Sequence, residues 1–598
     1  MRRGFSILGL VVALGLIVAA CGGTSATSTA VPPTKAPTAT TAGSTSAPTT
    51  AGQPTATTAA TATVRPTAAP TATTAPAPTS TAAPISAGEI KITTPNLQNF
   101  ELNPGISLTG GRGNPMEETL YDPTMSTKIE GPFDPATGFV LSFSANADST
   151  VWTIKVRDNV VFHNGDKATA EDLAFLIDLA LAADAPYNSA SEIKAVVEKV
   201  AAVDATTMVV TLKKLNIVWP QTTLSRSRVQ SGSSFYLLAK KYTLATGQQA
   251  ANKNPVGSGP YKFKSVTVGD RVVVEAVDYR HWYYGVPRTK TITFIQTPEE
   301  STRVALLKAK DVDAAPIALS NINPIKQAGF RTVVRENSLV GQAWSAQYPA
   351  VIPGYGPNPL ANKLVRHALF YYGVDRKAIV DKFLYGVGVP STDFPVTPSE
   401  LYAFKPQEVP VYDPVKAKAL LVQAGSPNGF PVDFYTNTVS PTIPTAPDID
   451  EAVAVWWENL GIKVTRKPYT GAVLQQLWLA KYKTGDWGKP TLSGIGAGPG
   501  YREIGSSDAV LHYNPEAFPF VSNDPEGLRL GLAWQNAKTI DEYAKAGQAY
   551  QAYAHENANT WIGYYYTGEA WAASDKMSSR WKLGKDAGFR LSDAVALR

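Results

Sequence analysis

The chain has 598 residues, of which 44% are hydrophobic, and it carries 55 Lys and Arg against 49 Asp and Glu. Residues 1–87 hold four of the basic residues and no acid, which leaves 51 basic and 49 acidic residues, a net charge of +2, in the rest of the chain. Such a balance argues against a nucleic-acid-binding surface. The remaining stretch of about 510 residues is too long for one ordinary hydrophobic core, so we expect at least two lobes.

Residues 1–20 are expected to form an export signal. Arg2 and Arg3 precede an apolar run over residues 7–20, which is shorter than the ~20 residues that a membrane-spanning helix needs. The run ends in the sequence VAAC, which resembles the lipobox of bacterial lipoproteins, in which the cysteine is lipidated and becomes the mature N-terminus. Cys21 is the only cysteine of the chain, and lipidation explains a lone cysteine in an exported protein. The alternative is a plain signal peptide that happens to contain a cysteine.

Residues 21–87 are expected to form a disordered stalk. After Cys21 they are almost entirely Thr, Ala, Pro, Ser and Gly, without an aromatic residue and with only Lys35 and Arg65 charged. Such a segment cannot bury enough apolar surface to offset the entropy of ordering. Its prolines favour extended polyproline II, with an upper reach on the order of 200 Å.

The first distinct strand and helix are predicted at 152–156 and from residue 170 onward. Polar and apolar residues alternate over 152–156, as in a half-buried strand. Residues 173, 176, 177, 180 and 181 are apolar and lie on one face of a helix. Thr169 and Asp172 stand three residues apart at the start of this helix, which fits a variant of the capping box.

His163 lies near four acids, and the sequence alone allows either a metal or acid–base site or a turn followed by a helix cap. The four acids, all within sixteen residues of His163, are Asp166, Glu171, Asp172 and Asp178. A transition-metal site needs several ligands that converge within ~2.0–2.3 Å of the ion. One histidine and acids assigned to a turn and a helix start do not supply them, so we interpret the cluster as structural.

The remaining elements alternate between strands and helices, and the second half is therefore expected to be α/β. In the first half we expect a hairpin at 200–212, strands near 261, 270 and 289–297, and a short helix with a strand start at 298–315. In the second half we expect helices at 362–384, 412–425, 448–461 and 541–558, and strands at 430–437, 462–468 and 560–574. Asp413, Pro414 and Gly425 mark the cap, first turn and stop of the second of these helices.

Enzyme motifs are missing from the sequence. None of the five histidines, His163, His281, His367, His512 and His555, belongs to an HExxH motif. The chain has no CxxC, no GxxxxGK[ST] phosphate loop and no GxSxG elbow. We therefore expect no catalytic residues, no metal site and no cofactor.

Five segments in order resemble one family, the large extracytoplasmic solute-binding proteins of ABC importers, family 5, which bind oligopeptides, nickel complexes and some oligosaccharides. They are WTIKVRDNVVFHNGDKATAEDLAF, NPVGSGPYKF, GDRVVVEAVDYRHWYYGVP, VRHALFYYGVDRKAIV and YDPVKAKALLVQAG. The resemblance extends over residues ~90–598, and the lipobox and stalk agree with it independently.

The resemblance implies an α/β fold of the periplasmic-binding-protein type (type II, large cluster C), with two lobes, a hinge and a ligand cleft between the lobes. Lobe 1 would comprise residues 88–344 and 560–598, and lobe 2 residues 345–559. The implied function is capture of an organic solute, most simply an oligopeptide, and delivery to a membrane permease. The protein would be a monomer outside the cytoplasm, anchored to the cell membrane through Cys21.

The resemblance also implies ligand contacts at Tyr121, Trp344, Trp487 and Tyr501, whose segments lie at the cleft in the family. Aromatic rings suit sugar rings and apolar side chains. Each of the four residues could equally be part of the core.

One segment departs from the peptide-binding pattern. Peptide-binding relatives carry an acid after a tryptophan in a W..DY..P motif, which pairs with the peptide α-amine, whereas here Asp486 precedes Trp487 in the Gly-rich stretch 484–505. An oligosaccharide or metal-chelate ligand therefore stays open. So do a surface receptor or scaffold without transport and a secreted hydrolase of polysaccharide or peptide.

Overall fold

The computed structural model describes residues 86–97, 102, 116–125, 133–183, 185, 190–224, 236–345, 350–392, 407–438, 444–469, 488–499, 524–558 and 561–583. All of them belong to one compact unit, Thr79–Arg598.

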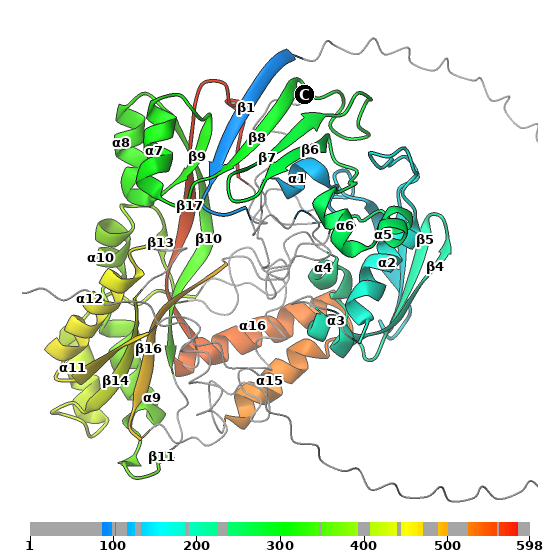
Figure 1. The fold of residues 1–598 in the computed structure, drawn as a ribbon. Helices are drawn as coiled ribbons and strands as arrows, with labels where there is room; N and C mark the ends of the chain where they lie inside the picture. Colours follow the sequence, from blue (N-terminus) through cyan, green and yellow to red (C-terminus); the bar gives the residue numbers. More distant parts are fainter. Residues whose placement is uncertain are drawn as a thin grey trace, which may run out of the picture. The chain divides into compact units, whose positions relative to one another are not determined.

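Eleven strands of the described residues form one mixed sheet (Figure 1). Ten of them follow the order β15-β14-β16-β10-β17-β9-β1-β8-β7-β6, and β13 pairs with β17. The strands are β1 (Ser86–Thr94), β6 (Tyr261–Thr267), β7 (Arg271–Ala276), β8 (Thr289–Gln296), β9 (Ala314–Ile317), β10 (Arg331–Ser345), β13 (Val389–Pro390), β14 (Pro431–Asn437), β15 (Lys463–Tyr469), β16 (Thr491–Pro499) and β17 (Trp561–Ala573).

The long strands β10 and β17 join the two ends of this sheet. They run antiparallel, with a register from Arg331 opposite Ala573 to Trp344 opposite Trp561. At one edge of the pair β16 adds to β10, and at the other β9 adds to β17. Figure 1 shows β10 and β17 side by side between the strands of the first half and those of the second. Residues far apart in the sequence therefore share one hydrogen-bonded sheet.

The first half carries a second, four-stranded antiparallel sheet, in the order β2-β3-β5-β4. Its strands are β2 (Val140–Ala145), β3 (Val151–Val156), β4 (Val197–Asp204) and β5 (Thr207–Leu212). The helices of this half are α1 (Glu117–Leu120), α2 (Ala170–Leu181), α3 (Ala190–Val196), α4 (Trp219–Thr223), α5 (Lys240–Thr246), α6 (Gln248–Lys253), α7 (Glu300–Lys308), η2 (Leu319–Asn321) and α8 (Ile322–Gln327). The predicted strand at 152–156 and the hairpin at 200–212 are confirmed as β3 and as β4 with β5.

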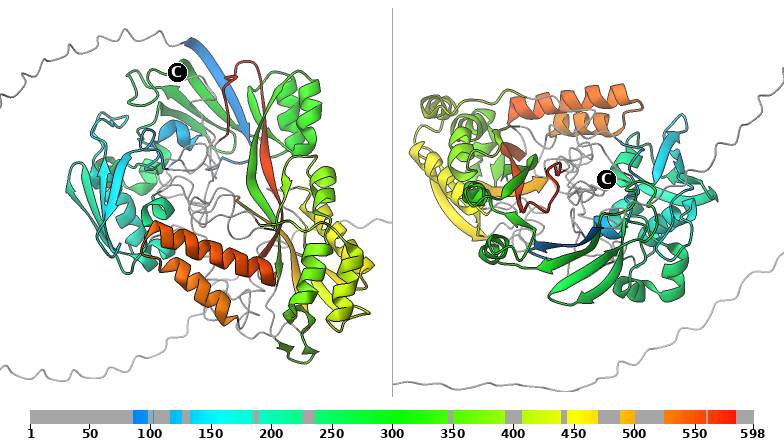
Figure 2. Two further views of the ribbon diagram at one scale, coloured as in Figure 1. Left: turned by 180° about the vertical axis from the view of Figure 1, so that it is seen from behind. Right: turned by 90° about the horizontal axis from the view of Figure 1, so that it is seen from above.

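In the second half, helix α12 (Ala446–Asn459) packs against the strands β14, β15 and β16. This half begins with a small hairpin of β11 (Val351–Ile352) and β12 (Gly356–Pro357). Its helices are η3 (Pro359–Ala361), α9 (Lys363–Arg366), η4 (His367–Tyr372), α10 (Arg376–Ala378), η5 (Ile379–Phe383), α11 (Pro414–Gln423), α12 (Ala446–Asn459), α15 (Pro525–Gln535) and α16 (Ile540–Asn557). Of these, η4 and η5 are π-helical turns. Figure 2 shows α15 and α16 packed against each other in both views.

Local signals explain where these helices begin. Asp413 accepts a hydrogen bond from the Lys416 backbone N–H at the start of α11, and Asp375 accepts one from Ala378 at the start of α10. Gly425, two residues after α11, has a φ of +79° and ends the helix as predicted. The helical segment expected at 362–384 is interrupted at Gly373, which follows the end of η4.

The described residues contain two large clusters of buried apolar side chains. The cluster of the first half includes Trp152, Trp219 and Phe294. The cluster of the second half includes Trp457, which is fully buried and whose indole N–H donates to the Leu369 carbonyl oxygen at 2.9 Å. Each half thus has a core of its own, as expected for a chain of this length.

Candidate functional site

The expected ligand site includes Trp344, whose backbone lies in the middle of the eleven-stranded sheet. The backbone of Trp344, near the end of β10, lies opposite Trp561 of β17 on one side and Ser493 of β16 on the other. The structure describes this backbone position and not the Trp344 side chain. Trp344 therefore lies where strands of the second half join the long pair β10–β17.

Tyr121 lies in the core of the first half. Its side chain is buried, and its hydroxyl donates a hydrogen bond to the Leu102 carbonyl oxygen at 3.0 Å. Its ring centroid lies 6.3 Å from that of Tyr236. Burial raises the pKa of Tyr121 well above its usual range. These contacts show that the Tyr121 ring packs in the core of the first half. A ligand contact at Tyr121 stays a prediction.

The remaining predicted site residues lie outside the described residues. They are the aromatic residues Trp487 and Tyr501 and the lipidation site Cys21. Their roles stay predictions.

A buried carboxylate behind β16 was not foreseen. Asp450 on α12 is fully buried, and its carboxylate packs so closely on Gly494 of β16 that a Cβ on Gly494 would lie 2.0 Å from Asp450 Oδ2. Burial, and next the charge of Asp450, raises the pKa of Tyr565 on β17. One carboxylate thus packs on β16 and acts electrostatically on a residue of β17. The sequence carried a signal, because Asp450 falls on the apolar stripe of α12 beside Ile449, Val453 and Trp457.

The cluster around His163 is a turn and a helix cap, as interpreted. Thr169 and Asp172 form a capping box at the start of α2. The His163 Nε2–H donates to the Gly259 carbonyl oxygen at 3.0 Å, and Nδ1 accepts the Gly257 N–H at 3.2 Å. Burial lowers the pKa of His163 to about 4, so the ring is neutral at pH 7. The histidine holds the 257–259 loop in place.

Replacing His163 with alanine is expected to lower the free energy of unfolding by about 1–3 kcal/mol, because two buried backbone groups lose their partner. The pKa of His163 is lower in the folded protein than in the unfolded chain. As the pH falls from about 6.5 to 4, the unfolded chain therefore binds a proton that the folded protein does not, and the wild type loses stability. Urea unfolding at pH 7.5 and at pH 5 measures both effects. The variant should lack this part of the pH dependence and keep its affinity for solute. Loss of affinity at unchanged stability would contradict a structural role.

Asp122, His281 and Ser258 lie together without the geometry of a hydrolytic triad. His281 Nε2 lies 3.3 Å from Asp122 Oδ1 and donates to the Ser258 carbonyl oxygen at 3.0 Å. The Ser258 hydroxyl instead accepts the Asp122 backbone N–H at 3.2 Å. In a serine hydrolase the carboxylate holds Nδ1–H and Nε2 faces the serine hydroxyl. All three residues are buried, with at most 2% exposure. Their hydrogen bonds hold the loop around Ser258 in place, and His281 is not positioned to take a proton from the Ser258 hydroxyl.

Neither a metal-ligand group nor a membrane-spanning helix occurs in the described part of the chain. No group of three or more His, Cys, Asp or Glu side chains is placed there to hold a metal ion. No described helix is long and apolar enough to cross a membrane.

Two α/β halves that share one sheet through two long strands define the α/β fold of the periplasmic binding proteins. Residues 135–502 match the bacterial extracellular solute-binding proteins, family 5 (middle region). The chain belongs to this family, whose members are the extracytoplasmic binding proteins of ABC transporters.

Two curated relatives are similar over part of the chain. Heme-binding protein A of Haemophilus influenzae is 27% identical over 388 residues, which cover 62% of this chain and 68% of the relative. Glutathione-binding protein GsiB of Shigella flexneri is 30% identical over 312 residues, which cover 50% of this chain and 54% of the relative. The match therefore spans about half the length of the glutathione-binding relative.

Solved structures are similar over most of the chain. HbpA2 from Haemophilus parasuis superposes with a TM-score of 0.68 at 20% identity, covering 85% of this chain and 99% of that one. A dipeptide-binding protein from Pseudoalteromonas sp. SM9913 in complex with Met-Leu gives 0.62 at 19% identity, covering 85% and 99%. NikZ from Campylobacter jejuni in complex with Ni(L-His) gives 0.61 at 18% identity, covering 86% and 99%. At these identities the likeness shows the fold.

Proposed function

We propose that this protein captures an organic solute between its two lobes and delivers it to the permease of an ABC importer, without bond chemistry. The observation that carries the proposal is the pairing of β10 with β17, which connects two separately packed halves through two strands of one sheet. Such a connection allows the halves to close about a bound solute. The proposed lobes are residues 88–344 with 560–598, and residues 345–559.

We favour a small peptide as the solute. One structural neighbour was solved with Met-Leu, and the curated relatives include glutathione-binding proteins. The Gly-rich stretch 484–505 lacks the acid that pairs with a peptide α-amine, so we expect a peptide whose amino terminus is blocked or bound elsewhere. An oligosaccharide or a metal chelate is the alternative within the family. We also propose that lipidated Cys21 and residues 21–87 tether a monomeric binding protein to the cell membrane.

A thermal-shift panel on the purified full-length chain tests this function. The panel contains free and N-acetylated di- and tripeptides, oligosaccharides and nickel–histidine, and native mass spectrometry checks each hit. A true solute at 100 times its Kd should stabilise the protein by about 2.7 kcal/mol. If every class leaves the melting temperature unchanged, capture of these solutes is refuted.

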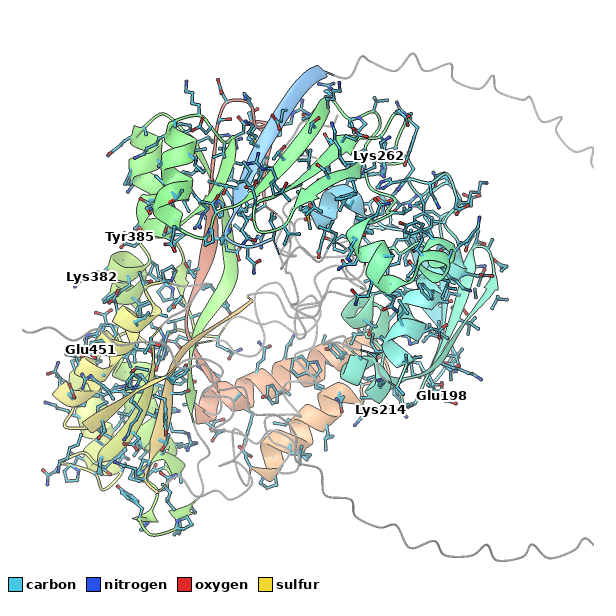
Figure 3. The ribbon with its side chains drawn as sticks, viewed as in Figure 1. Glu198, Lys214, Lys262, Lys382, Tyr385 and Glu451 are labelled. Carbon is cyan, nitrogen blue, oxygen red and sulfur yellow. The ribbon has the colours of Figure 1, made fainter. Side chains whose placement is uncertain are left out.

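Variants then locate the solute. Trp344→Ala and Tyr501→Ala are expected to weaken binding on the order of tenfold, because a stacked ring is lost. Tyr385→Ala is the matched control, because Tyr385 is 49% exposed and lies on the turn after η5 (labelled in Figure 3). An equal loss in all three variants would contradict a localised cleft site.

A further inference from the structure

A cavity lies among described residues of the second half of the chain. It has a volume of about 540 Å³ and lies between the π-turn η4, residues 408–416 and the last turn of α16. This volume falls within the roughly 300–1,000 Å³ of small-molecule sites. Tyr121 is not among the described residues that line it.

Three neighbouring rings form one wall of the cavity. The Tyr371 ring stacks on His555 with centroids 5.1 Å apart and lies 4.9 Å from the ring of His367. The Tyr371 hydroxyl donates to the His555 carbonyl oxygen at 2.6 Å, and His367 Nε2–H donates to the Glu556 carbonyl oxygen at 2.7 Å. Burial lowers the pKa of both histidines, so they are neutral at pH 7. The wall is therefore fixed and uncharged before any ligand arrives.

The described charged side chains that line this cavity are mainly acidic. Glu408, Asp413 and Glu556 line the cavity with one cation, Lys416. The charge of Glu408 reaches the cavity, because it opposes the lowering of the His555 pKa by burial. Because Glu556 pairs with Lys363 at 3.6 Å, two carboxylates, those of Glu408 and Asp413, face the Lys416 ammonium, and this balance favours a cationic guest.

Lys416 shows how an ammonium group is held at the rim. Its Nζ donates to the Tyr372 hydroxyl at 2.8 Å and lies 4.0 Å from the centroid of the Tyr372 ring. This hydrogen bond, and next the charges of Tyr372, Asp413 and Glu408, raise the pKa of Lys416. The Lys416 side chain is exposed, so a ligand can displace it.

We propose that this cavity binds a small organic cation, an aromatic or aliphatic amine, whose ammonium group lies between Glu408 and the Tyr372 ring and whose apolar part lies against the Tyr371–His555 wall. An aromatic face attracts an ammonium group, and nearby carboxylates add to the attraction. This site does not depend on the proposed solute capture in the cleft.

The test titrates benzylamine against the full-length chain at pH 7.5, observed by NMR, with benzyl alcohol as the neutral probe. Benzylamine should bind with a Kd below about 10 mM, and benzyl alcohol about threefold to tenfold more weakly. Glu408→Gln removes a charge at constant shape and should weaken benzylamine binding by about threefold to tenfold. Lys416→Ala should tighten it, because a competing ammonium is removed.

Glu198→Gln is the matched control, since Glu198 is exposed on β4 in the other half of the chain, as labelled in Figure 3. It should leave benzylamine binding unchanged. Equal binding of benzyl alcohol, or an unchanged Kd in both Glu408→Gln and Lys416→Ala, would overturn the proposal. Competition between benzylamine and a solute found in the cleft would also overturn it, because it would place the amine in the cleft.

Discussion

Replacing Arg376 with alanine is expected to lower the free energy of unfolding by about 3–5 kcal/mol, because several buried carbonyl oxygens lose their donor. The Arg376 side chain is buried, with 3% exposure, and it lies 5.1 Å from the ring centroid of Tyr564. Its guanidinium donates to four backbone carbonyl oxygens, those of Phe370 at 2.7 Å, Ser391 at 2.9 Å, Tyr371 at 3.2 Å and Gly563 at 3.4 Å. These belong to η4, to the segment after β13 and to β17, so one side chain ties the second half to a strand that joins both halves.

Charge on Arg376 persists throughout the neutral range. Burial lowers its pKa to about 10, which still leaves the guanidinium protonated at pH 7. In the unfolded chain the pKa is higher, so the two states bind different numbers of protons only above about pH 10. We therefore expect Arg376 to contribute no pH dependence of stability between pH 5 and 8.

Urea unfolding of three variants checks this assignment. Arg376→Lys keeps the charge but lacks the planar fork of donors, so it should lie between wild type and Arg376→Ala. Arg529→Ala is the control, because Arg529 pairs with Glu526 at the surface and should change stability by less than about 1 kcal/mol. If Arg376→Ala unfolds at the same urea concentration as Arg529→Ala, the carbonyl contacts contribute little.

Elements whose signals are local could be predicted from the sequence. The helices α2 and α11 begin directly after their caps, Thr169 and Asp413. Their starts could be predicted because the cap, the first turn and the apolar stripe lie within a few residues of one another. The strand β10 was not predicted, since its partner β17 lies more than 200 residues away and its own sequence contains Arg335 and Glu336 among apolar residues. Pairing over such distances depends on the whole fold.

Buried polar groups were harder to predict than helices. Arg376 follows a helix cap in the sequence, where a basic residue is usually exposed, yet it is buried among carbonyl oxygens. Asp450 interrupts an apolar stripe, a visible signal whose meaning depends on Gly494 in another element. Tyr121, which the resemblance places at the cleft, has its described contacts in the core, and a ligand contact there stays a prediction. A family resemblance indicates where a segment lies in the fold, whereas local packing decides in which direction each side chain points.

Gly257→Ala is expected to lower the free energy of unfolding by about 3 kcal/mol or more, because the added methyl group overlaps a fixed backbone atom. A Cβ on Gly257 would lie 1.8 Å from the Leu120 carbonyl oxygen, and one on Gly259 would lie 2.3 Å from that of Thr119. The GSG sequence alone indicates no more than a turn. In the structure both glycines allow this loop to lie directly on the backbone that leads to Tyr121, and the Gly259 N–H donates to the Leu120 carbonyl oxygen at 3.0 Å.

Gly269→Ala separates this contact from backbone strain. Gly269 has a φ of +82° and open space around its missing side chain, so alanine should cost about 1–2 kcal/mol through conformation alone. No positive φ accompanies Gly257, so its larger loss would come from the contact. Urea unfolding of both variants gives the comparison, and the solute affinity of the folded fraction shows whether the region of Tyr121 has shifted. A loss for Gly257→Ala no larger than that for Gly269→Ala would show that the loop can move away from Leu120, and would leave the position of Tyr121 independent of the glycine pair.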